Sequence, residues 1–130
     1  MNISTQEIDV MFKKNAKERY IYFVKKIADW ECVWALGDDS GYITTEDDDG
    51  KLSLPLWPAK EYAQKCAINE WKNLAVKEIS LDELLDDLLP ELIEDDVDVV
   101  AFMSPDETGL PTLSAADVLK DLLAECEKYE

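Results

Sequence analysis

The stretch VDVVAFM, residues 97–103, is apolar at every position except Asp98. A strand with one face in water alternates apolar and polar residues, whereas a strand covered on both faces is a nearly continuous apolar run. We therefore predict that residues 97–103 form a central strand with other elements packed on both of its faces.

Helices are predicted on both sides of this strand, and each begins with a capping box. Ser80 and Glu83 open the helix before the strand. Ser114 and Asp117 open the last helix, which is predicted to bury Val118, Leu119, Leu122, Leu123 and Cys126. Pro90 lacks an amide hydrogen, so a kink or break is expected there. The inner face of the earlier helix is predicted to consist of Leu81, Leu84, Leu85, Leu88 and Leu92.

Residues 4–29 are predicted to form one helix, capped by Ser4 with Glu7 three positions later. Apolar residues recur along it at three- and four-residue steps. The same segment holds most of the basic residues of the N-terminal half, namely Lys13, Lys14, Lys17, Arg19, Lys25 and Lys26.

The middle of the chain has the composition of β-structure. Residues 32–36, 42–45 and 52–56 are rich in strand formers and are separated by turn signals, so a three-stranded antiparallel meander is expected. Pro58 suits the first position of a helix that runs to about Trp71. Residues 75–79 are predicted to form a further short strand.

The length and composition fit a single domain. With 130 residues and an apolar fraction of 47%, the chain can bury a core without disulfides. We find no internal repeat or linker. The predicted fold is a single α+β domain over residues 1–130, with a mainly antiparallel sheet of about five strands packed by about four helices.

The chain is expected to be soluble and cytoplasmic. Its N-terminus lacks the basic and apolar regions of a signal peptide, and no apolar run approaches the roughly 18 residues of a membrane span. Cys32, Cys66 and Cys126 are odd in number and lie among apolar neighbours, so we interpret them as buried thiols in a reducing compartment.

The negative charge is concentrated in one part of the chain. Residues 1–65 carry nine basic and twelve acidic side chains, net −3, whereas residues 66–130 carry four and eighteen, net −14. A locally acidic surface repels nucleic acid and membranes and attracts basic partners. The candidate partner contacts are Asp82, Glu83, Asp86, Asp87, Glu91, Glu94, Asp95 and Asp96, together with Trp57, the tryptophan between two prolines.

No catalytic or metal motif competes with this acidic segment. The chain contains no histidine, which excludes triads and zinc sites built on that residue. An EF-hand reading of the acidic run before Gly50 places Thr45 at the first ligand position and Leu56 at the twelfth, so the loop lacks essential ligands. We expect no metal, no cofactor and no enzymatic activity.

Several segments carry a resemblance to a known family. On these segments the whole chain resembles a family of small bacterial proteins classed as a domain of unknown function. That family has no assigned activity, so the resemblance implies a compact bacterial domain and assigns no functional residue. The segments are ERYIYFV at 18–24, VWAL at 33–36, LPLWP at 54–58, EYA at 61–63, EW at 70–71 and ISL at 79–81.

The leading functional hypothesis is an immunity-type inhibitor of a basic nuclease toxin. Nuclease sites are lined with Lys and Arg that hold phosphates, so an acidic helix face can imitate that ligand. The alternative is an acidic adaptor or accessory protein without a toxin partner, either a monomer or a weak homodimer. The inhibitor hypothesis depends on the segment from Leu81 to Asp96 being exposed, because contact with the basic first helix would make its charge structural.

Overall fold

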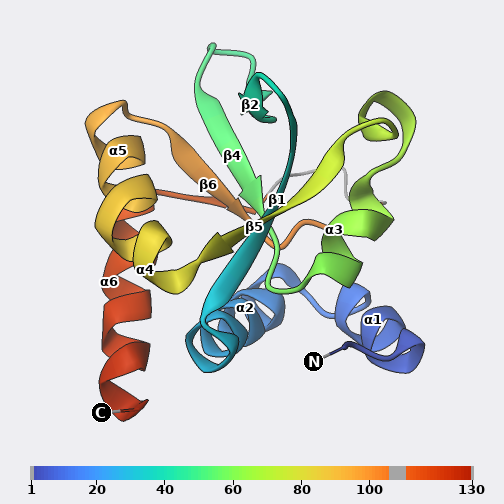
Figure 1. Ribbon diagram of the computed structural model, residues 1–130, viewed down its shortest axis with the longest axis horizontal. Helices are drawn as coiled ribbons and strands as arrows, with labels where there is room; N and C mark the ends of the chain where they lie inside the picture. The colour runs from blue at the N-terminus through green and yellow to red at the C-terminus, as the bar shows by residue number, and fades with distance from the viewer. Residues whose placement is uncertain (1, 106–110, 130) are drawn as a thin grey trace.

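The computed structural model describes residues 2–105 and 111–129 (Figure 1). The helices are α1 (Thr5–Phe12), α2 (Ala16–Trp30), α3 (Lys60–Cys66), α4 (Leu81–Glu83), α5 (Leu89–Glu94) and α6 (Ala115–Cys126). A π turn, η2 (Leu84–Leu88), joins α4 to α5, and η1 (Asn69–Trp71) and η3 (Glu127–Tyr129) are 3-10 turns. The strands are β1 (Cys32–Asp38), β2 (Gly41–Tyr42), β3 (Thr45–Glu46), β4 (Leu52–Leu56), β5 (Ala75–Ser80), β6 (Asp98–Ala101) and β7 (Thr112–Leu113).

The strands form two sheets, with the orders β2-β1-β5 and β3-β4-β6-β7. Every pairing is antiparallel except that of β4 with β6. The predicted α+β class is therefore confirmed, but its strands are divided between two sheets rather than held in one. The reason is that the segment from Gly41 to Glu46 crosses over: β2 pairs with β1, whereas β3 pairs with β4.

The central strand is β6, which lies between β4 and β7. Val99, Val100 and Ala101 are buried, as the apolar run predicts. The strand ends at Ala101, two residues before the predicted end, because Phe102 adopts a φ of 60° that no strand contains. Figure 1 shows the helices around the two sheets, with α4, α5 and α6 on one side, α3 on the opposite side and α2 below.

The predicted first helix is in fact two helices. Ser4 caps α1 as predicted, since its hydroxyl accepts from the amide of Glu7 at 3.1 Å. The chain then breaks at residues 13–15, and Asn15 caps α2 by accepting from the amide of Glu18 at 2.8 Å. The signal for this break is the Asn15 and Glu18 pair, a second capping box that the regular apolar spacing obscures.

The predicted helix through Trp71 is also shorter than expected. It begins at Lys60 rather than Pro58 and ends at Cys66. The chain extends at Ile68, and Asn69 adopts a φ of 55°, after which a single 3-10 turn contains Trp71. Trp71 therefore packs from a separate turn.

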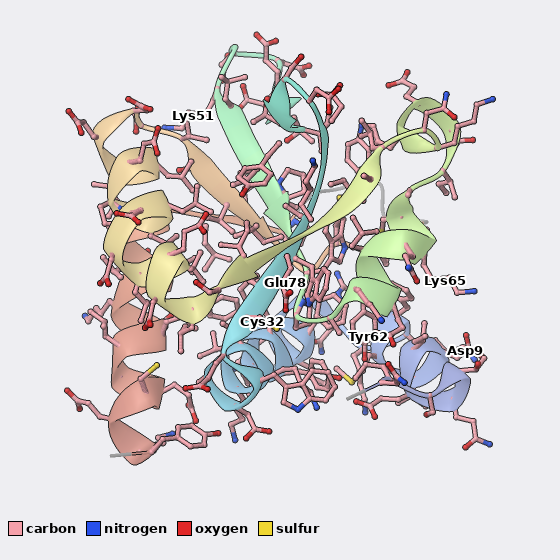
Figure 2. The ribbon with its side chains drawn as sticks, in the orientation of Figure 1. Asp9, Cys32, Lys51, Tyr62, Lys65 and Glu78 are labelled. Carbon is pink, nitrogen blue, oxygen red and sulfur yellow. The ribbon has the colours of Figure 1, made fainter. Side chains whose placement is uncertain are left out.

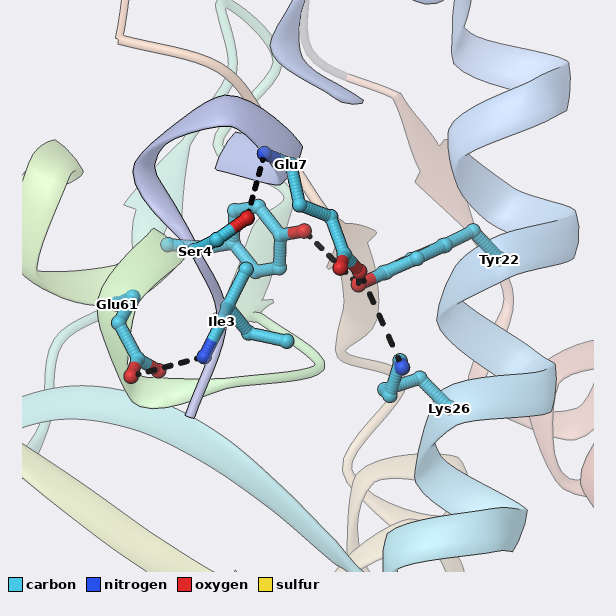
Figure 3. Close-up of polar contacts among 7 residues, drawn as sticks. Ile3, Ser4, Glu7, Tyr22, Lys26 and Glu61 are labelled. Atoms are coloured by element: carbon cyan, nitrogen blue, oxygen red, sulfur yellow. Dashed lines mark hydrogen bonds and ion pairs between the residues drawn. The ribbon is translucent and has the colours of Figure 1, made fainter. Parts of the chain in front are cut away.

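A hydrogen-bonded network attaches α1 to the rest of the fold (Figure 3). Tyr22 on α2 donates to the carboxylate of Glu7 on α1 at 2.5 Å, and its hydroxyl lies 2.9 Å from that of Tyr62 on α3. The ammonium group of Lys26 lies 4.0 Å from the same carboxylate. Burial is the main cause that raises the pKa of Tyr22, and it also raises the pKa of Tyr62 to about 12.

These tyrosines predict a loss of stability at alkaline pH. The unfolded chain releases tyrosine protons near pH 10, whereas the folded chain holds the Tyr62 proton to about pH 12. The stabilisation is therefore complete below about pH 10 and is lost as the pH rises through the folded pKa values. We expect the free energy of unfolding to fall less steeply above about pH 10 in Tyr22→Phe than in the wild type. Urea titrations across that range measure this, and equal slopes would contradict it.

Candidate functional site

The acidic segment is built on one continuous helical stretch, α4, η2 and α5. Ser80 caps it, accepting from the amide of Glu83 at 3.1 Å, as the capping box predicts. Of the kink or break expected at Pro90, the break is absent, because the helical stretch runs through Pro90. It lies in the first turn of α5, directly after the π turn in which the amide of Leu89 bonds the carbonyl of Leu84. The wider turn accommodates a residue that has no amide hydrogen to donate.

The π turn also changes which leucines face the core. Leu84, Leu89 and Leu92 are buried, whereas Leu81, Leu85 and Leu88 are only half-buried. A five-residue turn places residue i+5 where an ordinary helix would place i+4. Leu89 therefore takes the core position that helical spacing predicts for Leu88.

All eight predicted acidic contacts on this segment are exposed. Within residues 2–105 and 111–129, one of them has an ion-pair partner: Asp96 lies 2.6 Å from the ammonium group of Lys51, which Figure 2 labels. The other seven have none among the described residues. We call these seven the acidic face; they are Asp82, Glu83, Asp86, Asp87, Glu91, Glu94 and Asp95.

Within the described residues, no ion pair joins the acidic face to the basic helices α1 and α2. Helix α6 contacts both α2 and α5, and the hydroxyl of Tyr20 on α2 donates to Asp121 on α6 at 2.6 Å. The ion pairs of the α1 and α2 region, Lys14 with Glu18 and Lys26 with Glu7, stay within that region. The charge of the acidic face is therefore not neutralised inside the described fold.

The end of α5 is electrostatically unfavourable. A helix C-terminus carries a partial negative charge and favours basic residues. Here Glu94 is the last residue and Asp95 the C-cap, and the last turn contains no basic residue. Asp96 follows with a φ of 56°, in the position where helix ends usually have glycine. Asp96 is ion-paired with Lys51, but Glu94 and Asp95 have no basic partner among the described residues and disfavour the folded helix.

Replacing Glu94 by Lys is accordingly expected to stabilise the fold by about 0.5 kcal/mol at low salt. The reversal substitutes attraction for repulsion at the end of the helix. Urea unfolding measures the change, and Asp39→Lys at an exposed turn is the matched control because it alters net charge equally. A destabilised Glu94→Lys variant would show that Glu94 has a structural role.

Trp57 does not belong to this surface, and its assignment as a candidate contact is wrong. Its side chain is 0% exposed, whereas Trp30, Trp34 and Trp71 are all half-buried. The backbone of Trp57 forms two 2.8 Å hydrogen bonds with Trp34, the bridge between the two sheets. Trp57 is buried because it lies where the sheets meet.

The cysteines are less buried than predicted. Cys66 is buried, but Cys32 and Cys126 are half-buried, and none of the three forms a disulfide within the described residues. Burial raises the pKa of Cys32, and the nearby charge of Glu78 raises it further, against a hydrogen bond from Trp34 that lowers it. Figure 2 shows Cys32 and Glu78 close together in the middle of the molecule. A raised pKa is the opposite of what a nucleophilic thiol needs.

The acidic hairpin tip is organised by its own backbone. A side-chain oxygen of Asp47 accepts from the amides of Asp49 and Lys51, both at 2.9 Å. This carboxylate therefore closes the turn.

Among the described residues, no group of three or more acidic or sulfur side chains is placed to hold a metal ion. No helix within residues 2–105 and 111–129 combines the length and apolar character needed to cross a bilayer.

Sequence reasoning missed a hollow of about 320 Å³ beside Trp71. Its lining includes Cys66, Met103 and Glu70. The signal was available in the paired Glu70 and Trp71, which we interpreted as the end of a longer helix. One carboxylate and one half-buried indole can hold a small group, but they do not form an acid and base pair.

Comparison with protein families places the chain. A family model described as "Protein of unknown function (DUF2750)" matches residues 20–122. The chain belongs to this family. The DUF2750 match includes the whole acidic face and both sheets and begins within α2. It therefore confirms membership in a domain-of-unknown-function family. No curated protein matches the chain.

Proposed function

We propose that this chain is a non-enzymatic, acidic protein-binding domain that binds a basic protein through the acidic face. One observation carries the proposal: seven exposed carboxylates share a continuous helical segment and have no basic partner in the described chain. At the end of α5 these charges disfavour the fold. Residues that disfavour stability without a structural benefit are typical of functional surfaces.

The partner that fits best is a nuclease toxin, which the chain would inhibit as an immunity protein. A nuclease holds the phosphates of its nucleic acid with Lys and Arg. A row of carboxylates carries negative charge as those phosphates do, so it can bind the same basic site. The leucines of α4, η2 and α5 support this row from the core side. Rigid support favours inhibition, because little side-chain or backbone order is then lost on binding.

The second candidate is an acidic adaptor that self-associates. Lys13, Lys14, Lys17 and Lys25 are exposed on the α1 and α2 region, so the basic surface of one copy could bind the acidic face of another. Such an assembly depends on charge alone and should dissociate into monomers as salt rises. Light scattering across a salt series separates the two functions.

The proposed function is tested by capture of basic proteins from a cell extract at about 50 mM and about 500 mM salt. We expect a protein of high pI to bind at the lower salt and to be released at the higher. Capture should fail with a variant that carries Asp86→Lys, Asp87→Lys and Glu91→Lys. A nuclease assay of the captured protein, with and without added chain, tests inhibition.

The matched control for that experiment carries Asp39→Lys, Asp48→Lys and Asp49→Lys, which change net charge equally at exposed turns. This control should still capture the partner. If both variants lose the partner to the same extent, net charge and not the acidic face governs binding. Recovery of no basic protein at low salt would contradict the proposal as a whole.

A further inference from the structure

Exposed apolar side chains lie next to the acidic face. Ile93 on α5 is 42% exposed, and Leu123 on α6 is 48% exposed. Together with Ala116 and Leu119 they line a groove of about 440 Å³ between the two helices. Apolar side chains that gather in one groove, rather than being scattered singly, are typical of interaction sites.

The groove exists because α6 has two apolar stripes. Ala115, Val118 and Leu122 are buried and hold the helix to the core. A second stripe, Ala116, Leu119 and Leu123, is rotated by one residue and lines the groove. Sequence analysis placed Leu122 and Leu123 together in the core, and for Leu123 this was wrong. Adjacent helical residues point about 100° apart, so Leu122 faces the core while Leu123 lines the groove.

The charge around the groove is mainly negative. Glu127 is the acid among the lining residues, and Glu94 and Asp95, two exposed members of the acidic face, directly follow Ile93 in the chain without lining the groove. Lys120 is the basic side chain among the lining residues. The groove thus combines an apolar floor with a mainly negative border.

This charge pattern favours a basic partner over a second copy of the chain as the occupant of the groove. In a symmetric dimer across the groove, the same surface of both copies would meet, and the acidic rims would face each other. A partner with an apolar stripe flanked by Lys or Arg meets both requirements, since its apolar residues enter the groove while its charges face the rim. The apolar stripe on α6, Ala116, Leu119 and Leu123, follows helical spacing, and an amphipathic helix presents a matching stripe, as in helix-in-groove recognition.

We infer that the groove between α5 and α6 is an anchoring site for a basic amphipathic helix of the partner. The inference rests on the proposed function and adds the contacts that the acidic face lacks. Exposed charges steer association but contribute little affinity, whereas buried apolar anchors contribute most of it. Ile93, Leu119 and Leu123 are those anchors on this side of the interface.

The test uses two fluorescent peptides of about 18 residues, isomers that contain the same numbers of Leu and Lys. In one isomer the leucines form a stripe at helical spacing, and in the other they are dispersed. Fluorescence anisotropy at about 50 mM salt should show the striped isomer binding at least about tenfold more tightly. Leu123→Ser and Ile93→Ser should each remove most of that difference, whereas Ile68→Ser, an equally exposed isoleucine elsewhere, should leave it unchanged.

One substitution of a charged residue in the groove is expected to strengthen binding rather than weaken it. Lys120→Glu should tighten binding of the striped isomer several-fold, because it removes repulsion from the peptide's lysines. If the two isomers bind equally tightly and salt weakens both equally, the groove is not an anchoring site, whereas the proposed function stands. Binding of neither isomer at low salt would count against both. If the striped isomer still binds more tightly to a variant that carries both Leu123→Ser and Ile93→Ser, the groove is likewise not the anchoring site.

Discussion

Replacing Arg19 by Met is expected to lower the free energy of unfolding by about 3 kcal/mol. Arg19 is only 4% exposed, although it belongs to the most basic part of the chain. Its Nε donates to the carbonyl of Phe102 at 2.9 Å, and its Nη1 donates to the carbonyl of Lys14 at 2.7 Å. Met fills similar volume but removes the donor from the buried carbonyl of Phe102 and from the part-buried carbonyl of Lys14.

The Phe102 contact makes this loss larger than that of an ordinary hydrogen bond. Phe102 has a φ of 60°, which is rare for a bulky residue and costs on the order of 1 kcal/mol or more. Arg19 from α2 and Leu56 from β4, whose carbonyl accepts from the Phe102 amide at 2.9 Å, both hold this conformation. Removing the arginine therefore weakens the turn that ends the central strand.

Urea unfolding monitored by circular dichroism measures this effect. Arg19→Lys should recover only part of the stability, because an ammonium group lacks the planar fork that reaches two carbonyls in different directions. Lys17→Met is the matched control at an exposed position of the same helix, and it should change stability by less than about 0.5 kcal/mol. A similarly small change in Arg19→Met would refute the structural role assigned to Arg19.

Replacing Trp57 by Ala is expected to cost about 4 kcal/mol. The indole is fully buried, and its Nε1 donates to the carbonyl of Met103 at 3.1 Å. The substitution opens a large cavity at the place where the two sheets meet. Because the bridge to Trp34 is made by backbone atoms, the variant weakens packing on both sheets without removing the bridge directly.

Trp57→Phe separates packing from hydrogen bonding. It keeps an aromatic ring but removes the donor to Met103, so we expect a cost of about 2 kcal/mol. Trp34→Phe at the half-buried partner should cost less. Guanidinium unfolding of the three variants gives these differences, and a Trp57→Ala variant as stable as the wild type would contradict the burial of this residue.

Three helix starts were predictable because capping is local. Ser4, Ser80 and Ser114 each accept from the amide three residues later, as their spacing to an acidic residue predicts. The same chemistry at Asn15 was overlooked, since apolar spacing continues across the break between α1 and α2. The error arose because the apolar spacing was given more weight than the Asn15 and Glu18 capping pair, although both signals are local.

The pairing of β4 with β6 could not be predicted in the same way. The two strands are parallel and are separated in the chain by β5 and the acidic helical stretch. Nothing in residues 52–56 specifies a partner so far along the chain, since strand formers pair wherever the rest of the fold places them. Trp57 was misplaced for the same reason, because its burial results from the meeting of the sheets and not from its flanking prolines.

The sequence by itself determined where the negative charge lies, where the capped helices begin and that residues 97–103 contain an interior strand. These properties depend on composition and on contacts within a few residues. Only the tertiary structure decided that Arg19 is internal, that Leu123 lines a groove while Leu122 is buried, and that the acidic face stays unpaired. Each of these depends on which surface of an element meets a distant neighbour, and long-range packing sets that orientation.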